Sequence, residues 1–333
     1  MTELREAWAQ LEASAQKGSA IDQVRLFGDE PLNLLAVFRP DTKHVGIQLD
    51  VLAASVPAVG LFPSPGAFVT TSERFGDRTR ISVFLAKSEF KDVFTEMCAD
   101  LLLTCRGASS ETQAVRALHS RLHTWRELFL GSGPVPLSEA EQLGLFGELT
   151  FLLASLDHGI APAAAIGGWY GPKRHHHDFH FDSVHVEVKA TEAQSMVVSV
   201  SSLAQLDSGK LEHLFLWQFE LRHDPTGISL PGLVHLIRER LAIAGSSAEF
   251  NLLLICARYL DSHSSNYAEV LYLIARETVF AVESGFPSLT RNTVDEAVRQ
   301  ATYAFDLGLV PTKFHITSVD AFAAILAGLN TKK

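Results

Sequence analysis

Two short runs near the middle of the chain alternate between apolar and polar residues, the first of them from its second residue on. They read HDFHFD from residue 177 and VHVEVKAT from residue 184. Alternation with a period of two is typical of β-strands, because successive side chains point to opposite faces. The Asp182-Ser183 pair between the runs favours a turn. We therefore predict a β-hairpin with one apolar face and one polar face.

The polar face of this hairpin brings acidic and basic groups together. Glu187 and Lys189 lie two residues apart on one strand, and Asp178 lies on the other. Two carboxylates that converge across adjacent strands suit a hard divalent cation such as Mg²⁺, which prefers oxygen ligands. A nearby lysine stabilises charge on a phosphate. The pattern thus predicts metal-assisted phosphodiester hydrolysis; the alternative is an ordinary surface ion pair between Glu187 and Lys189.

The segments around the hairpin predict a chain of mixed α/β type with more than one domain. With 333 residues, the chain can form two or three domains of roughly 100–200 residues each. A helix over residues 1–17, antiparallel strands over 24–85 and a helix over 90–103 describe the first part. We expect a strand-rich N-terminal domain at 1–108, a core with its preceding helices at 109–245, and a C-terminal α+β extension at 246–333.

Within the later parts, apolar periodicity indicates further elements. An amphipathic helix covers residues 111–130, and Ser138 with Glu141 forms a capping box that starts a second helix ending near residue 156. MVVSVSSLAQL predicts a strand leading into a short helix, LEHLFLWQFEL a long buried strand, and LPGLVHLIRERLA a helix. NLLLICARYL and VLYLIARETVFAVE predict strands, TVDEAVRQATYAF a helix or a helix-to-strand join, and AFAAILAGL a terminal helix.

The charge balance limits where nucleic acid could bind. The 28 Lys and Arg residues stand against 38 Asp and Glu residues, for a net charge of -10. Such a chain is unsuited to coating nucleic acid non-specifically, so any contact with phosphate must be local. The candidates for this contact lie on the helix at 111–130 and on the loop before the hairpin; they are Arg116, Arg126, Lys173, Arg174 and His176.

Other classes of protein find no support in the sequence. No apolar run approaches 18 residues, and the start MTELREAWAQLE lacks the plan of a signal peptide, so we expect a soluble cytoplasmic protein without membrane contact. The three cysteines form no CxxC pair, which excludes a structural zinc site built from cysteines. Phosphate-loop, dinucleotide-binding and nucleophile-elbow motifs are absent from the sequence.

The order of these segments resembles the PD-(D/E)xK nuclease superfamily. More narrowly, the chain resembles an uncharacterised prokaryotic family assigned to that superfamily and typically encoded among restriction-modification and phage-defence genes. The segments that carry this resemblance span nearly the whole chain; they are GLFGELTFL, GWYGPKRHHHDFHF, VEVKAT, VSVSSLAQL and GFPSLTRNTVDEAVRQATYAFDL. The resemblance implies a restriction-endonuclease-like core, with a mixed central sheet flanked by helices.

The resemblance also implies roles for individual residues. Asp178 and Glu187 would bind Mg²⁺, for which Mn²⁺ could substitute, and Lys189 would be the catalytic lysine. Glu148 matches an acidic residue on the helix before the sheet, where Gly144 and Gly147 would let a metal or a DNA strand approach. The sequence departs from the pattern because His177 replaces the proline before Asp178, and because only eight residues separate Asp178 from Glu187.

Two further features bear on the site. Gln205, in SSLAQL, could line it or serve as a helix cap. His175, His176, His177, His180 and His185 crowd the hairpin and could bind Zn²⁺, Ni²⁺ or Mn²⁺. Three consecutive histidines on an extended chain cannot all point at one ion. We therefore expect a loop near DNA phosphates in preference to a zinc site.

These observations favour one function and leave two alternatives open. The first is a Mg²⁺-dependent endodeoxyribonuclease that restricts foreign DNA together with other restriction or defence proteins. The need to cut two strands makes a homodimer one expectation. The second is a catalytically silent DNA-binding or assembly subunit of a defence complex. The third is a histidine-dependent metallohydrolase acting on a small phosphoester.

Overall fold

The structure is a computed structural model. It describes residues 2–14, 21–28, 31–56, 66–130, 135–173, 175–192, 195–209, 211–242 and 246–330. The chain divides into two compact units, one formed by Met1–Val135 with Leu260–Ser262 and the other by Pro136–Tyr259 with His263–Lys333. The first boundary therefore falls near residue 135, whereas the sequence had placed it at 108.

The position of this boundary follows from the packing of one helix. Helix α3 (Glu111–Leu130) packs against α2 (Lys91–Arg106) in the first unit. Trp125 of α3 is fully buried, and its Nε1 donates a hydrogen bond to Asp100 Oδ2 of α2 at 2.8 Å. Because the apolar stripe of α3 is buried there, the helix belongs to the N-terminal unit and not to the core that follows.

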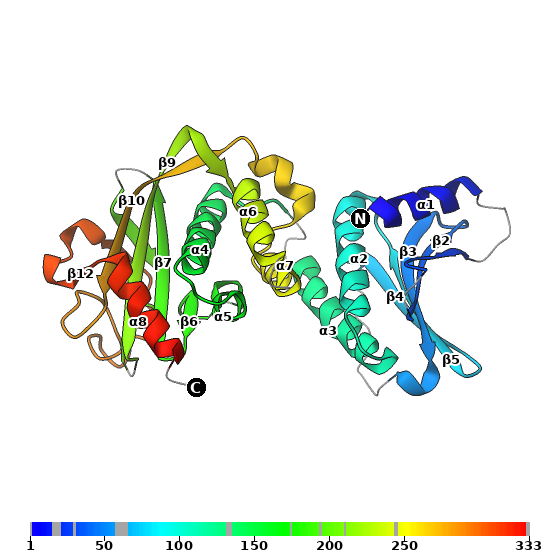
Figure 1. Ribbon diagram of the computed structural model, residues 1–333, viewed down its shortest axis with the longest axis horizontal. Helices are drawn as coiled ribbons and strands as arrows, with labels where there is room; N and C mark the ends of the chain where they lie inside the picture. Colours follow the sequence, from blue (N-terminus) through cyan, green and yellow to red (C-terminus); the bar gives the residue numbers. More distant parts are fainter. Residues whose placement is uncertain are drawn as a thin grey trace. The chain divides into compact units, whose positions relative to one another are not determined.

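The first unit is built on one antiparallel sheet. Its strands are ordered β1-β2-β3-β5-β4, and every pair is antiparallel. Helix α1 (Thr2–Ser14) lies against β2, and α2 lies beside α1 (Figure 1). The strands are β1 (Asp22–Arg25), β2 (Asn33–Arg39), β3 (His44–Leu52), β4 (Phe68–Phe75) and β5 (Arg78–Leu85). The strands predicted for the N-terminal part of the chain are confirmed.

The second unit contains a mixed five-stranded sheet in the order β12-β10-β9-β7-β6. Strands β7 and β9 are parallel, and the other neighbours are antiparallel. The strands are β6 (Phe179–Phe181), β7 (Val184–Glu192), β9 (His213–Ser229), β10 (Leu271–Ala281) and β12 (His315–Ile316). Since β10 pairs directly with β9, the C-terminal segment is part of the central sheet and not an appendage to it.

Different layers cover the two faces of this sheet. Helix α4 packs against β7, with α6 beside it, and α8 packs on the same face, where Phe151 of α4 stacks on Phe322 of α8 (Figure 1). The helices are α4 (Glu139–Asp157), α5 (Pro162–Gly167), α6 (Leu230–Ala242), α7 (Ser247–Cys256) and α8 (Ser318–Asn330). A two-stranded sheet of β8 (Val197–Val200) and β11 (Tyr303–Asp306) covers the other face through a second apolar cluster.

Most of the expected elements are present, and three are not. The run NLLLICARYL forms helix α7 and its C-terminal end instead of a strand. TVDEAVRQATYAF contains turns and strand β11 but no helix, and residues 202–206 after β8 form turns instead of a short helix. The capping box is confirmed, with Ser138 and Glu141 bonded reciprocally. Within the described residues, no helix has the length and apolarity needed to cross a membrane.

The contact between α4 and β7 depends on Gly147. A Cβ added at Gly147 would lie 2.8 Å from Ala190 Cβ and 3.5 Å from Val188 Cγ1, so the helix backbone touches the strand. A Cβ added at Gly144, one turn earlier, meets nothing within 4 Å. The two glycines therefore differ: Gly147 permits close packing of helix on strand, whereas Gly144 faces open space.

This difference predicts opposite tolerance to the same substitution. We expect Gly147→Val to destabilise the protein by about 1–3 kcal/mol, the usual cost of overpacking. Gly144→Val should change the free energy of unfolding by less than about 0.5 kcal/mol, as surface substitutions usually do. Urea unfolding followed by circular dichroism measures both. Equal destabilisation by the two variants would contradict this account of the α4–β7 contact.

Candidate active site

The candidate site lies where β7 extends past its neighbour β6. Strand β6 ends opposite Val186, because Phe179 is the partner of Val186 in the register. Just before β6, Asp178 turns its side chain to the backbone of β7, and its Oδ2 accepts a hydrogen bond from Val188 N at 2.8 Å. The carboxylate of Asp178 thereby takes the place that a neighbouring strand would occupy, and the hairpin fixes its position.

Glu187 and Lys189 form a close ion pair on the polar face of β7. Glu187 Oε1 lies 2.7 Å from Lys189 Nζ, and the Glu187 residue is only 1% exposed. Its other oxygen, Oε2, is buried and has no hydrogen-bond partner among the described residues. A buried carboxylate oxygen without a partner is costly, so this geometry provides a free ligand atom.

Glu148 reaches the same place from α4. Its Oε2 accepts a hydrogen bond from Trp169 Nε1 at 2.7 Å. A Cβ added at Gly171 would collide with Glu148 Oε2 and lie 3.1 Å from Asp178 Oδ1. Both carboxylates therefore crowd the same glycine, and only a residue without a side chain fits between them.

Burial raises the pKa values of these carboxyl groups, and the charge of Asp178 adds to the effect at Glu187 and Glu148. Burial, together with the charge of Asp178, raises the pKa of Glu187 to about 8. Burial likewise raises the pKa of Asp178, and burial with the Asp178 charge raises the pKa of Glu148 well above its ordinary value. Burial alone would lower the pKa of Lys189, but the surrounding carboxylates outweigh it, so the net shift is upward. Three carboxylates against one ammonium leave the site short of positive charge.

These side chains line one open hollow of about 530 Å³. Glu148, Asp178, Glu187 and Lys189 all contribute to its lining, and Gln205 lines it from the segment after β8. Gln205 Oε1 also accepts a hydrogen bond from Ser201 N at 2.8 Å, so this residue both borders the hollow and braces its own turn. The residues singled out in the sequence as one cluster are thus brought together in space.

One family of known proteins matches most of the chain. A protein-family model described as "Putative PD-(D/E)XK family member" (DUF4420) matches residues 4–308. The chain belongs to this family. A search of curated proteins and a search of solved structures each found no match. Membership of the PD-(D/E)XK family supports a nuclease-like α+β fold.

Sequence reasoning missed part of what shapes this candidate site in the PD-(D/E)XK family member. Trp169 is fully buried, and its indole Nε1 donates a hydrogen bond to Glu148. Gly171 permits the approach of the two carboxylates, and its backbone N–H donates to the Asp178 carbonyl at 2.9 Å. The glycine-rich context GGWYGP was the available signal, since glycines beside a large aromatic residue indicate close backbone approach.

A buried polar pair lies behind the lysine. Gln218 on β9 is the register partner of Lys189 and is 1% exposed. Its Nε2 donates to Thr191 Oγ1 at 3.1 Å, while its Oε1 has no partner among the described residues. Nothing in the apolar run LEHLFLWQFEL distinguished this glutamine, because its neighbour on β7 becomes known only from the strand pairing.

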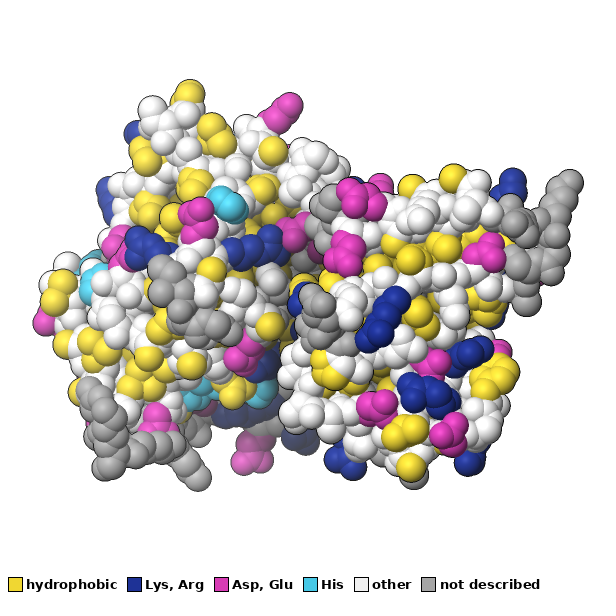
Figure 2. All heavy atoms as spheres, turned by 45° about the vertical axis from the view of Figure 1, so that its right-hand side comes forward, with side chains coloured by type: hydrophobic (Ala, Val, Ile, Leu, Met, Phe, Trp, Pro, Cys, Tyr) yellow, Lys and Arg dark blue, Asp and Glu magenta, His cyan; other side chains and the backbone are white. Residues whose placement is uncertain are grey.

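The basic residues expected to contact phosphate are not assembled around the hollow within one unit. Arg116 and Arg126 lie on α3 in the first unit, where Arg126 pairs with Glu127 at 3.0 Å. Lys173 lies over the ring of Tyr170 at 4.5 Å. His176 is exposed, and Arg174 falls outside the described residues. Figure 2 shows basic and acidic side chains interspersed on the visible face.

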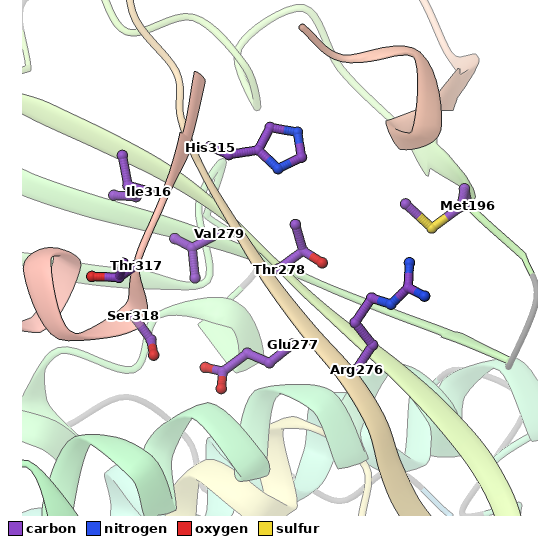
Figure 3. A pocket seen from close by; sticks show the side chains of 9 residues that line it. All are labelled: Met196, Arg276, Glu277, Thr278, Val279, His315, Ile316, Thr317 and Ser318. Carbon is purple, nitrogen blue, oxygen red and sulfur yellow. The ribbon is translucent and has the colours of Figure 1, made fainter. Parts of the chain in front are cut away.

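Another hollow, of about 510 Å³, lies over strand β10 (Figure 3). Arg276 and Thr278 line it from β10, and His315 lines it from β12. Among its described lining residues the single carboxylate is Glu277, which accepts a hydrogen bond from Trp217 Nε1 at 2.7 Å. This hollow therefore gathers no cluster of acids, and the hollow at β7 is the better candidate for metal chemistry.

The histidines near the site divide into two groups. His175 and His176 are exposed, whereas His177, His180 and His185 lie together at the base of the hairpin. Burial, reinforced by the neighbouring imidazoles, lowers the pKa of His177 and of His180 to about 4. These rings are therefore uncharged near neutral pH and add no positive charge for DNA.

The raised pKa of Glu187 predicts how the stability of the metal-free protein depends on pH. The pKa of Glu187 is about 8 in the folded protein against an ordinary value of 4.5, so the folded state binds more protons between these values. Stability should therefore fall as the pH rises through this window. At about 1.4 kcal/mol per pKa unit, we expect a loss of a few kcal/mol, measured by urea unfolding in EDTA.

The substitution Glu187→Gln should make this pH dependence less steep, because it removes one of the titrating groups, while Glu148 and Asp178, whose pKa values are also raised, continue to titrate. The matched control is Glu192→Gln, which changes an exposed glutamate at the end of the same strand. We expect the control to keep the wild-type slope. An unchanged slope in Glu187→Gln would show that other groups control the pH dependence.

Proposed function

We propose that this protein is a divalent-metal-dependent endodeoxyribonuclease that hydrolyses DNA phosphodiesters. The observation that supports this proposal most strongly is the convergence of Glu148, Asp178, Glu187 and Lys189 on one hollow. Carboxylates that share a site with one lysine are the parts that metal-assisted phosphodiester hydrolysis needs. The order of these residues along the chain also agrees with membership of the PD-(D/E)XK family.

The residues present fit a hard divalent cation. Glu187 has a buried oxygen without a partner among the described residues, and the raised pKa values of Glu187 and Glu148 show that Lys189 alone does not offset three ionised carboxylates. Asp178 and Glu187 would hold Mg²⁺, with Glu148 as a further ligand directly or through water, and Mn²⁺ would substitute because it also accepts oxygen ligands. When bound, the ion would polarise the phosphate and lower the pKa of water.

The chain's own residues then have distinct tasks. Lys189 remains protonated because the carboxylates raise its pKa, and it therefore stabilises negative charge on the phosphate instead of removing a proton. Val188 N orients Asp178, and Trp169 Nε1 orients Glu148. Held carboxylates lose little freedom when they engage a ligand, which is the advantage of a preorganised site.

We extend the proposal to a biological setting. The resemblance of the sequence segments to a family found among restriction-modification and phage-defence genes supports a role in destroying foreign DNA with partner defence proteins. A homodimer would place two such hollows to cut both strands. The first unit and the basic residues of α3 would then contribute to the choice of DNA substrate.

A second function has one observation in its favour. The net charge is -10, and Arg116 and Arg126 lie in the other unit from the acidic hollow. Both facts suit a catalytically silent subunit that keeps the nuclease fold for assembly or DNA binding. The complete set of carboxylates and lysine at the hollow favours the active enzyme.

Cleavage of plasmid and linear DNA tests the first function directly. With Mg²⁺ or Mn²⁺ present, we expect Lys189→Ala and Asp178→Ala each to lower the cleavage rate at least about 100-fold, the usual loss when a group that stabilises transition-state charge is removed. EDTA should abolish cleavage. The control Lys43→Ala removes an exposed lysine of the first unit and should leave the rate unchanged.

The results of this assay distinguish the active nuclease from the silent subunit. Cleavage that survives both site substitutions would refute the proposed site. DNA binding by the wild type without cleavage under any metal condition would favour the silent subunit.

Metal binding can also be measured without DNA. Mg²⁺ at 100 times its Kd should stabilise the protein by about 2.7 kcal/mol. Because Mg²⁺ binds the deprotonated carboxylates, the same Mg²⁺ concentration should stabilise the protein more at pH 8 than at pH 5. Asp178→Asn should greatly weaken this stabilisation. Thermal unfolding with and without MgCl₂ provides the measurement, and equal stabilisation of variant and wild type would argue against Asp178 as a ligand.

A further inference from the structure

A second cluster of metal-ligating side chains lies on the same hairpin and shares no residue with the carboxylate cluster. His177, His180 and His185 each offer a ring nitrogen, and these atoms lie within 4.8 Å of one another. His177 comes from the segment before β6, while His180 and His185 are register partners across β6 and β7. The strand pairing, and not their spacing in the sequence, therefore brings the three imidazoles together.

The distance between two of the rings suits a shared ion. His177 Nδ1 lies 3.0 Å from His185 Nδ1, which is a hydrogen bond when one of the two carries a proton. Two nitrogens bound tetrahedrally to one Zn²⁺ at about 2.0–2.1 Å lie roughly 3.3–3.4 Å apart. A metal ion that replaces the shared proton would thus need only a small separation of the rings.

Buried nitrogens without partners point to a ligand. His177 is 7% exposed, and its Nε2 has no hydrogen-bond partner among the described residues. The Nε2 of His180 is also buried without a partner there. The rings of His177, His180 and His185 also interact with the backbone of Ala204, His177 and Asp182 respectively, the kind of contact that commonly orients a metal-binding imidazole. Backbone contacts therefore hold the three rings, while the Nε2 atoms of His177 and His180 remain available to a ligand.

His180 needs to move for all three rings to bind one ion. Its ring is parallel to that of His185, with centroids 4.0 Å apart and an angle of 4° between the planes, and it stacks on Tyr170 at 4.3 Å. A nitrogen lone pair lies in the plane of its ring, so parallel rings cannot both point at one ion. His180 is half-buried, and a rotation of its side chain would complete the set.

We propose that His177 and His185, joined by His180, bind one transition-metal ion of the Zn²⁺ type. Imidazole ligands favour Zn²⁺, Ni²⁺ and Cu²⁺, whereas Mg²⁺ prefers oxygen, so this site differs in chemistry from the carboxylate cluster. The ion would tie the segment before β6 to β7, next to Asp178. The inference goes beyond the proposed nuclease function and does not require it.

The test is Zn²⁺ binding to the untagged, metal-free full chain by isothermal titration calorimetry. We expect one Zn²⁺ per chain at this site. Substituting a residue that hydrogen-bonds to a metal ligand typically lowers the affinity for the metal by about 10–100-fold. Removing a ligand with His177→Ala or His185→Gln should therefore lower the affinity at least about 100-fold. His235→Ala, which removes a histidine whose side chain is 75% exposed, should leave the affinity unchanged.

A further variant distinguishes the two clusters. Asp178→Asn changes none of the three imidazoles, and Asp178 bonds the backbone of Val188, so it should lower the Zn²⁺ affinity by less than about 10-fold, the lower end of the loss that follows from changing a ligand's hydrogen-bond partner. Zn²⁺ binding that is lost in Asp178→Asn and retained in the histidine variants would overturn the proposal, as would the absence of Zn²⁺ binding by the wild type. If His177→Ala fails to fold, His180→Gln and His185→Gln change half-buried rings and keep the test decisive. Because none of these measurements uses DNA, their outcome is separate from that of the cleavage assay.

Discussion

The rest of the second unit is organised around the buried ion pair of Glu187 and Lys189. The cluster that contains this pair has more acidic groups than basic ones. Glu187 and Lys189 lie 2.7 Å apart with little access to water, and two further carboxylates share the hollow with them. Burying charge costs free energy, and breaking one partner of such a pair leaves the other uncompensated. The surrounding fold must therefore supply enough stability to hold acids that would separate if they were free. Strongly shifted ionisation of this kind clusters at functional sites.

That stability comes from the opposite face of the same strand. While Glu187 and Lys189 point to the hollow, the alternating valines of β7 point to α4, where Phe151 contacts Phe179 and Trp217 with ring centroids 4.5 and 4.9 Å apart. An aromatic core of this kind fixes the strand positions, because close-packed interiors resist small displacements. The hydrophobic face thus determines where the charged face stands, and the site inherits its rigidity from residues that take no part in its chemistry.

The same logic explains which parts could be predicted from the sequence. The hairpin at Asp182 and the approach of Asp178 to Glu187 follow from alternation, which is a local property. The place of Glu148 beside them was implied only by the resemblance to the nuclease superfamily. The strand prediction for NLLLICARYL was wrong because a short, mostly apolar segment shows no clear period. Such a segment can be buried as a helix as well as a strand. Gln218 was unpredictable for a different reason. Its partner Lys189 lies on a strand distant in the sequence, so its neighbour depends on a pairing that sequence alone does not specify. The histidines of the hairpin could be named from the sequence, but not which three of the five lie together.

Register is therefore the level at which this site is encoded. The pairing of His180 with His185 sets which side chains meet across β6 and β7, and it leaves Asp178 beside the backbone of Val188. A slip of one residue would move every side chain of the strand to the other face. It would place Glu187 against the aromatic core and a valine in the hollow. The free-energy penalty for that exchange is large on both faces of the strand. The apolar packing and the polar site therefore both disfavour a shifted strand register. One short hairpin can then hold oxygen and nitrogen ligand sets side by side without mixing them.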